Sequence, residues 1–511
     1  MKTHLMYRNR DFDPGQRLPA NAETLARDLD LGVLFSAMAE GDDFLAQVAK
    51  RAVLSALGDD ADTMLYRQAV LRDCLRHRAV VERLYEVALA TLERKRRMWL
   101  GLMGFASTPA SILRSAVDLL DMLTEALTEL KSVTQGQAQA FASEGFRALL
   151  SLLDTELTDA YLGRVRIELE HLRFPRGALL RARLGAGNQA TGYVLQRPTD
   201  AQPGFLGRIF NRKPAYSFRL SERDDLGART LGEMQSAGMQ ETAEAVARSA
   251  DEVLSFFVTL RTELAFYLGC ANLHRRLAEK GLPLCFPEPC AAGTRKHACT
   301  GLCDPCLALT THGPVVGNEL AADGRQLVVI TGANQGGKST FLRAIGVAQL
   351  MMQAGMFVAA EAFSAEICPG LYTHYQREED KAMERGRFDD ELARMSDIVD
   401  MLVPGSLLLL NEPFASTNER EGSEVAGQVI RSLLGQRMKI VLVTHLYELA
   451  RDLWLDRSLA TSFLRAEREA GGTRSFKLPP GEPLRTSFGL DLYRAVFGDD
   501  TLKASVSRAI D

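Results

Sequence analysis

The chain has 511 residues, of which 46% are hydrophobic and 25% charged, as is typical of a globular protein. Its 61 Lys and Arg residues against 65 Asp and Glu residues give a net charge of −4, which excludes nucleic-acid binding through overall positive charge. No apolar run approaches the roughly 20 residues that span a bilayer, and the N-terminus lacks the apolar core of a signal peptide. We therefore expect a cytoplasmic protein without membrane contact, whose eight cysteines are thiols or metal ligands rather than disulfides.

The first part of the chain is predicted to be helical with one β insert. Residues 1–176 form the helical region, because apolar residues recur at spacings of three and four with few Gly or Pro breaks. Residues 177–222 carry short apolar and aromatic runs separated by Gly, Pro and Asn, which predicts a small β insert. The helical pattern returns over residues 223–280, and a connector rich in Pro and Cys follows over residues 281–313.

Residues 314–511 show a different pattern, in which short apolar runs alternate with amphipathic stretches. The runs QLVVITG, MFVA, SLLLLNEP and KIVLVTH are predicted strands, and ELARMSDIVDML is a predicted helix. This alternation favours a mainly parallel sheet covered by helices. The fold class is therefore multidomain α and α/β.

A phosphate-binding motif lies at the start of this α/β region. The segment GANQGGKS, from Gly332 to Ser339, matches G-x-x-x-x-G-K-[ST] in full and stands between a predicted strand and a predicted helix. Its glycines let backbone N–H groups point at phosphate oxygens, and the helix N-terminus adds positive charge. Lys338 would reach the outer phosphates of ATP, and the Ser339 hydroxyl would bind Mg²⁺. The alternative, a chance glycine-rich turn, is disfavoured by this context.

Two later strands each end on polar residues. Four leucines precede Asn411 and Glu412, and the run KIVLVTH ends on His445. Ligands bind where parallel strands end, so Glu412 is predicted to orient or deprotonate a water and His445 to sense the terminal phosphate. The alternatives are an acidic residue that merely ends a strand and a structural histidine.

The order of these motifs resembles the ATPase domain of the MutS family, the mismatch-repair ATPases related to ABC transporters. The resemblance runs in order through TGANQGGKSTFLRAIG, FDDELARMSDIVDML, NEPFASTNEREGSEVA, VTHLYELA and TSFGLDLYRAVFG. It is weaker upstream, where DLDLGVLF and LYRQAVLRDCL are similar to the family's core and lever region. It implies an ABC-type P-loop ATPase domain that forms a homodimer head to tail, in which each signature helix completes the partner's site.

The resemblance also implies roles for individual residues. Glu412 and His445 would be catalytic, and Ser339 would hold Mg²⁺ with Asn411 and Glu412 acting through water. The residues implied to contact ATP are Gly332, Ala333, Asn334, Gln335, Gly336, Gly337, Lys338, Ser339, Thr340, Asn318 and Asn411.

The chain departs from the family pattern at several positions. Asn411 stands where the family has an Asp, which predicts weaker Mg²⁺ binding or turnover. Gly386 and Arg387 replace a Ser that often precedes the signature Phe, and Val315 and Val316 replace an aromatic residue near the adenine. The chain begins in the helical core, without the Phe-x-Glu wedge of a mismatch-reading domain, and shows no nuclease-like tail. Recognition of single mismatches by this chain alone is therefore not expected.

DNA contact is predicted through the basic segment 164–219, which covers most of the β insert. Ten Arg and one Lys against two Glu and one Asp give this segment a local charge of +8, and phosphate binding gains free energy from such a patch. In the family the DNA clamp is a β insert at a comparable place. The alternative is an arginine-rich solvated face. The basic run Arg94–Arg97 is interpreted as solvated helix surface.

The connector carries a cysteine cluster. Cys303 and Cys306 form a C-x-x-C pair, and with Cys290 and Cys299 they could bind zinc in a tetrahedral site. No second C-x-x-C is present, so free thiols are the alternative.

The leading hypothesis is a MutS-like dimeric ATPase that couples ATP binding and hydrolysis to the clamping of branched or damaged DNA. The alternative is a weakly hydrolysing dimeric scaffold that binds ATP together with protein partners, a ribosome or RNA. An ABC-transporter subunit is disfavoured, because an LSGGQ-type signature is absent.

Overall fold

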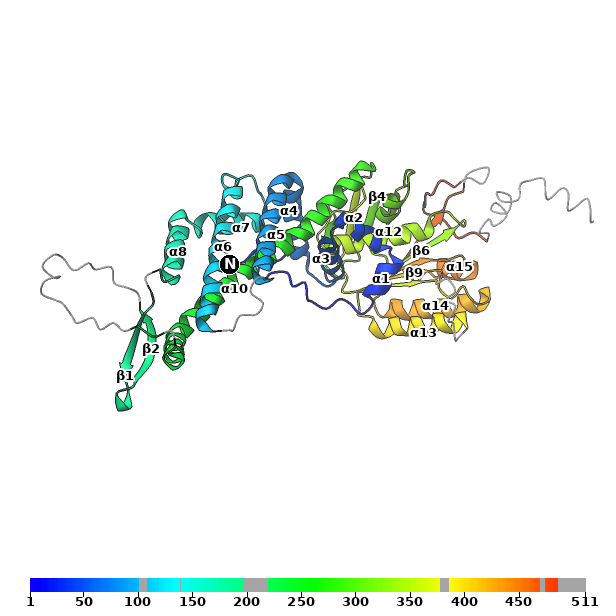
Figure 1. The fold of residues 1–511 in the computed structure, drawn as a ribbon. Coiled ribbons are helices and arrows are strands. Elements are labelled where there is room, and N and C mark those ends of the chain that lie inside the picture. The colour runs from blue at the N-terminus through cyan, green and yellow to red at the C-terminus, as the bar shows by residue number, and fades with distance from the viewer. Residues whose placement is uncertain are drawn as a thin grey trace, which may run out of the picture. The chain divides into compact units, whose positions relative to one another are not determined.

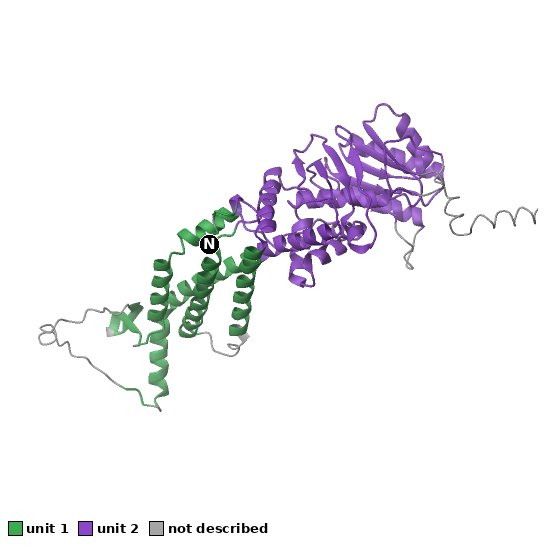
Figure 2. Ribbon diagram, turned by 90° about the horizontal axis from the view of Figure 1, so that it is seen from above, with its two compact units in different colours: residues 1–3, 79–141, 146–261 green, residues 4–78, 142–145, 262–511 purple. Residues whose placement is uncertain are grey.

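The structure is a computed structural model that describes residues 1–100, 108–137, 139–175, 177–196, 219–221, 223–376, 386–468 and 474–485. The described residues divide into two compact units (Figure 2). Unit 1 comprises residues 1–3, 79–141 and 146–261, and unit 2 comprises residues 4–78, 142–145 and 262–511.

Unit 1 is built mainly from long helices. Its helices are α5 (Arg78–Leu100), α6 (Pro109–Thr134), α7 (Glu144–Thr155), α8 (Asp159–Leu172) and the first part of α10 (Asp225–Glu279). The helix α6 begins where Thr108 accepts a hydrogen bond from the Ser111 N–H and Pro109 occupies the first turn. Apolar residues of α6, α8 and α10, among them Leu113, Leu169 and Ala243, pack into one buried cluster.

The β insert of unit 1 is an antiparallel hairpin of β1 (Leu179–Leu184) and β2 (Ala190–Gln196), joined by the short 3₁₀ helix η1 (Ala186–Asn188). Leu180 pairs with Leu195 across the hairpin, and the Leu180 side chain lies against Gly238 of α10. The opposite face carries Arg181, paired with Val194, in exposed positions. The hairpin thus packs one face on a helix and leaves a basic face open.

Unit 2 contains two sheets (Figure 1). The five-stranded sheet has the order β11-β6-β10-β9-β8, and all its neighbouring strands are parallel. Its strands are β6 (Leu327–Gly332), β8 (Leu371–Tyr375), β9 (Leu407–Asn411), β10 (Lys439–Val443) and β11 (Thr461–Ala466). The four-stranded sheet has the order β3-β7-β4-β5 and consists of β3 (Glu288–Cys290), β4 (His297–Leu302), β5 (Asn318–Ala321) and β7 (Ala362–Glu366). The predicted mainly parallel sheet is confirmed.

Helices from both ends of the chain belong to unit 2. They are α1 (Ala22–Asp28), α2 (Leu31–Ala39), α3 (Asp43–Leu54), α4 (Ala61–Arg76), α11 (Pro305–Thr310), α12 (Lys338–Gln353), α13 (Arg387–Met401), α14 (Glu419–Gly435) and α15 (Tyr447–Leu455). Helix α1 lies on the edge strand β8, where the Asn21 amide donates to Leu371 O at 2.8 Å and the Thr373 hydroxyl donates to Asp28 at 2.7 Å. Helix α1 therefore covers the edge of the parallel sheet, whereas the sequence grouped it with the lever helices.

The sequence assigned one strand of unit 2 wrongly and did not predict six others, which are β3, β4, β5, β7, β8 and β11. The run MFVA forms no strand, and its Val358 makes only an isolated bridge to Cys285. The strands that follow α12 are instead β7 and β8. Both lack a long apolar run, because β7 alternates buried residues with more exposed ones and β8 buries the polar Thr373 and His374.

Within the described residues, α10 is the one helix with an 18-residue window apolar enough to cross a membrane. Two-thirds of that window is buried inside the protein, with a mean hydropathy of 1.4. Phe256, Phe257 and Phe266 are among its fully buried side chains, so packing accounts for the apolar character of this helix.

Candidate functional site

The phosphate-binding motif forms a loop between β6 and α12, at the carboxyl end of the parallel sheet. Gly332 and Gly337 have φ angles of 103° and 85°, which non-glycine residues rarely adopt. A Cβ on Gly336 would lie 2.6 Å from the Ala466 Cβ at the end of β11. The glycines are thus needed both for the turn and for the close approach of the neighbouring strand.

The N-terminus of α12 has no side-chain cap. Its N-cap residue is Gly337, and no side chain accepts a hydrogen bond from the first turn. By contrast, Asn418 caps α14 by accepting from the Glu421 N–H at 3.0 Å. The first N–H groups of α12 and the positive end of its dipole are therefore available to an anion.

Two motif side chains are held by neighbours in the same site. The Lys338 ammonium is buried and donates to Gly332 O and Ala333 O, both at 3.0 Å. Burial lowers the pKa of Lys338, and the nearby Glu412 carboxylate opposes that shift. The Ser339 hydroxyl donates to Asn411 Oδ1 at 2.8 Å, which joins the loop to the end of β9. The structure therefore brings Lys338, Ser339 and Asn411 together.

Glu412 and His445 also meet at this sheet edge. Glu412 follows β9 and His445 follows β10, and the Glu412 Oε2 lies 3.1 Å from the His445 Nδ1. The hydrogen bond with His445 lowers the pKa of Glu412, and the same bond raises the pKa of His445. Glu412 is thus a carboxylate at neutral pH, as the acceptor of a water proton must be.

The remaining motif residues lie as follows. Gly336 N–H donates to Ala333 O at 3.2 Å, and Gln335 adopts a positive φ of 56°. Asn334 is exposed, and its carbonyl accepts from Arg474 Nε at 3.3 Å. Thr340 is half-buried in the first turn of α12. These residues all lie on the loop or on the first turn that follows it.

Asn318 has a different environment from the other predicted contacts. Its amide donates to Phe476 O at 3.0 Å and accepts from the Leu478 N–H at 2.8 Å. Both of its hydrogen-bonding groups therefore hold the C-terminal segment 474–480 against the start of β5.

That segment brings residues to the phosphate loop that the sequence did not single out. Phe476 lies 3.7 Å from a Cβ placed on Gly337, has a positive φ of 58° and leaves 47% of its surface exposed. Arg474 bonds to the loop at Asn334, and Lys477 donates to Gly317 O at 2.7 Å. The local sequence signal is an aromatic residue flanked by basic residues, in RSFK.

The structure does not bring the predicted zinc ligands together. Among the described residues, which include all four cysteines, no group of three or more His, Cys, Asp or Glu side chains could hold a metal ion. Cys290 and Cys299 lie on β3 and β4, whereas the Cys306 thiol points to Leu29 O, 3.7 Å away. Burial raises the pKa of Cys299 to about 12 and raises that of Cys303. The spacing in sequence therefore does not become proximity in space, and the cysteines are free thiols.

The basic segment is described only in part, because residues 176, 197–218 and 222 lie outside the described residues. Arg164, Arg181 and Arg183 are exposed on α8 and β1. Arg173 differs, because Asp118 and Asp121 of α6 lie 3.1 and 2.8 Å from its guanidinium. The charge of this segment is therefore open on the hairpin and neutralised at Arg173.

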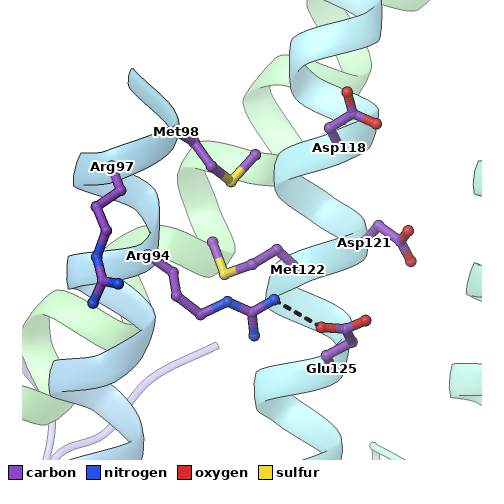
Figure 3. Close-up of a pocket in the computed structure, with 7 residues that line it drawn as sticks. All are labelled: Arg94, Arg97, Met98, Asp118, Asp121, Met122 and Glu125. Carbon is purple, nitrogen blue, oxygen red and sulfur yellow. Dashed lines mark hydrogen bonds and ion pairs between the residues drawn. The ribbon is translucent and has the colours of Figure 1, made fainter. Parts of the chain in front are cut away.

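The run Arg94–Arg97 lies beside a surface pocket of about 330 Å³ between α5 and α6 (Figure 3). Arg94 donates to Glu125 of α6 at 3.0 Å, and Arg97 lies 3.6 Å from Glu93 of its own helix. Both arginines are more than half exposed. This run is solvated, charge-paired helix surface, as the sequence suggested.

The signature segment forms α13, which begins after Gly386. The closing segment TSFGLDLYRAVFG lies outside the described residues, as do residues 377–385.

Two family models match the chain. The model of the MutS2 N-terminal domain matches residues 59–280, and the model of MutS domain V matches residues 328–497. The second match contains the phosphate loop, Asn411, Glu412 and His445. The chain belongs to the MutS family.

The similarity of this MutS-family chain to these curated relatives covers about a third of its length. It is 34% identical over 168 residues to the DNA mismatch repair protein MutS of Thermus aquaticus, which is 33% of this chain and 20% of that protein. It is 32% identical over 190 residues to that of Synechococcus sp. (strain CC9902), 36% of this chain and 21% of that protein. With the MutS protein homolog 4 of Mus musculus it shares 30% over 141 residues, 28% of this chain and 15% of that protein. The chain thus matches about a fifth of the length of these relatives.

Proposed function

We propose that this chain binds ATP with Mg²⁺ and hydrolyses it. The observation that carries the proposal is the uncapped N-terminus of α12. This helix begins at Lys338, whose ammonium donates to the phosphate loop and lies near the Glu412 carboxylate. A triphosphate would replace the two carbonyl oxygens that now accept from Lys338 and would also accept from the first N–H groups of α12.

Ser339 and Asn411 would hold the metal ion. Their oxygen atoms already share a hydrogen bond at 2.8 Å, and oxygen ligands with water are the donors that Mg²⁺ prefers. When bound, Mg²⁺ supplies positive charge that offsets the charge of the phosphates. The neutral Asn411 makes this site less charged than one with a carboxylate.

Glu412 would orient the attacking water and accept its proton. Its pKa is lowered chiefly by the hydrogen bond with His445, so the carboxylate is formed before substrate binds. His445 lies 3.1 Å from that carboxylate and would exchange this partner for the terminal phosphate. Binding of the terminal phosphate would thereby release Glu412 from its hydrogen bond with His445.

Phe476 would supply the contact with the base. It is exposed beside Gly337, where an aromatic face can stack on adenine. This side chain offers the aromatic surface that Val315 and Val316 do not.

We further propose a homodimer formed through the ATPase domains and DNA binding through the basic segment 164–219. Support comes from the exposed arginines of β1 and from the names of the mismatch-repair relatives. Branched or damaged DNA is the proposed substrate.

The test is steady-state ATP hydrolysis by the purified chain, with no DNA or with linear, mismatched or four-way-junction DNA. The variant Glu412→Gln is the blank, and Glu424→Gln, an exposed carboxylate of α14, is the matched control. We expect turnover that one DNA form stimulates, a loss of about 10²-fold or more in Glu412→Gln and no loss in the control. Equal turnover in both variants would overturn the proposed role of Glu412.

A second candidate function is an ATP-binding dimeric scaffold for protein, ribosome or RNA partners, and Asn411 favours it. Its amide carries no charge, although it fills the metal-binding position beside Ser339. ATP binding without turnover above the Glu412→Gln blank would establish this second function and reject the first.

A further inference from the structure

The loop between β9 and α14, residues 412–418, has an unfavourable backbone. Glu412 has a φ of 53° and Phe414 a φ of 59°, in the left-handed region that costs non-glycine residues free energy. Such a conformation persists only where surrounding contacts enforce it. The position of the Glu412 carboxylate therefore depends on what holds this loop.

Three of the contacts that hold the loop are made by β10 and α13. The Glu412 N–H donates to Val443 O of β10 at 2.8 Å. The Phe414 ring is buried, with its centroid 6.2 Å from that of Phe388 in α13. The Ser416 hydroxyl donates to the Glu391 carboxylate of α13 at 2.6 Å. Two of the three contacts are thus made by the first turns of α13.

Glu391 is an unusual anchor. It is only 3% exposed, and within the described part of the chain its Oε2 accepts from Ser416 while its Oε1 has no hydrogen-bond partner. Burying a carboxylate costs free energy that one hydroxyl only partly offsets, and the distance of 2.6 Å is typical of a hydroxyl bonded to a charged acceptor. An apolar residue would fill this position at less cost if packing were its only role.

We propose that Glu391 is a positioning residue for Glu412, acting through Ser416 so that α13 sets the place of the water-orienting carboxylate. The proposal rests on the proposed ATP hydrolysis, because that gives Glu412 its role. A displacement of α13 would release Ser416, and the loop would then lose its left-handed conformation at Glu412. Helix α13 would thereby influence the reaction of its own chain through the contact between Glu391 and Ser416.

The test compares Ser416→Ala with Thr417→Ala. Thr417 is the next residue of the same loop, and its hydroxyl donates to Glu421 of α14 at 3.1 Å instead of to α13. Hydrogen exchange of peptides that cover residues 411–418 reports the loop directly and needs no turnover. ATP affinity and kcat are measured on the same proteins, and Glu391→Gln, which keeps an acceptor for Ser416, is compared with Glu391→Leu.

In Ser416→Ala and Glu391→Leu we expect about tenfold faster exchange in the loop and about tenfold lower kcat, with ATP affinity within about twofold of the parent. Glu391→Gln restores much of both, and Thr417→Ala changes neither. Parental exchange in Ser416→Ala would overturn the proposal, as would an equal effect in Thr417→Ala. If the parent chain has no turnover, the exchange result still decides the positioning role, while the proposed ATP hydrolysis fails separately.

Discussion

The phosphate loop of unit 2 and the β hairpin of unit 1 both offer positive charge, but they hold it differently. Lys338 is buried, and its ammonium donates to two backbone carbonyl oxygens, both at 3.0 Å. Arg181 and Arg183 project from a two-stranded hairpin into solvent. One charge is fixed by tertiary structure, and the others are free to adjust.

This difference follows from what each region would bind. Chemistry at a phosphate needs groups held in place before the substrate arrives, which burial and hydrogen bonds provide. Contact with a nucleic-acid backbone needs only mobile charge, because counterion release does not depend on one geometry. Substitutions should therefore have large, site-specific effects in the first region and small, salt-dependent effects in the second.

The largest effect is expected for Lys338→Met. Because hydrogen bonds to charged groups contribute about 1.5–3 kcal/mol, ATP affinity should fall about 10- to 100-fold. Fluorescent-nucleotide binding measures this, with Lys50→Met as the control, since Lys50 pairs with the exposed Glu23 on another helix. Equal affinity in the two variants would show that Lys338 does not bind the phosphates.

Gly336→Ala tests whether the loop is as tightly closed as the structure indicates. The new Cβ would lie 2.6 Å from the Ala466 Cβ and 2.9 Å from Ala333 O. Such overpacking costs about 1–3 kcal/mol, so the melting temperature should fall by several degrees. Gly435→Ala, at a helical position with nothing within 4 Å, should match or exceed the parent. Unchanged melting of Gly336→Ala would mean that β11 does not close on the loop.

Asn411→Asp restores charge at the metal-binding position. The Asp carboxylate still accepts from Ser339, and each added ligand charge strengthens Mg²⁺ binding, so we expect about tenfold tighter Mg²⁺ in the presence of nucleotide. Titration of Mg²⁺ against ATP turnover or nucleotide affinity gives the value. No change would argue that Asn411 does not approach the metal.

Arg181→Ala with Arg183→Ala tests the open charge of the hairpin. If both arginines contact DNA phosphates, the slope of log affinity against log salt should decrease by about 2, with a modest loss of affinity. Arg173→Ala is the internal comparison, because Asp118 and Asp121 already neutralise that guanidinium. A slope equal to that of the parent would exclude the hairpin from DNA contact.

The smallest effect concerns the pair of Glu412 and His445. The His445 pKa is raised above 6.5, and it should fall toward 6.5 in Glu412→Gln, as an NMR titration would show. A raised histidine pKa stabilises the fold below pH 6.5 and loses this effect as the pH rises through the folded pKa. The lowered pKa of Glu412 stabilises the fold above pH 4.5, and this stabilisation is lost as the pH falls through the folded pKa of Glu412. The parent should therefore exceed the variant in stability most clearly between pH 4.5 and 6.5. A difference in stability that is constant with pH would show that Glu412 and His445 do not form this hydrogen bond.

The phosphate site could be predicted from sequence because its information is local. The eight residues from Gly332 to Ser339 encode the turn, the helix start and the lysine within one segment. The apolar strands that end at Asn411 and at His445 are also local patterns, and parallel pairing brings their ends together. The physical reason is that strand direction alone decides which sheet edge these residues share.

Tertiary structure decided the rest. Phe476 reaches Gly337 because β11 pairs with β6, and Ser416 reaches Glu391 because α13 packs on β8, the strand next to β9. Neither pairing has a local code, since each depends on contacts between segments far apart in the chain. The cysteines are close in sequence but do not meet in space, because they lie on separate elements, β3, β4 and α11. Proximity along the chain specifies a turn or a strand end, whereas proximity in space is set by how the elements pack.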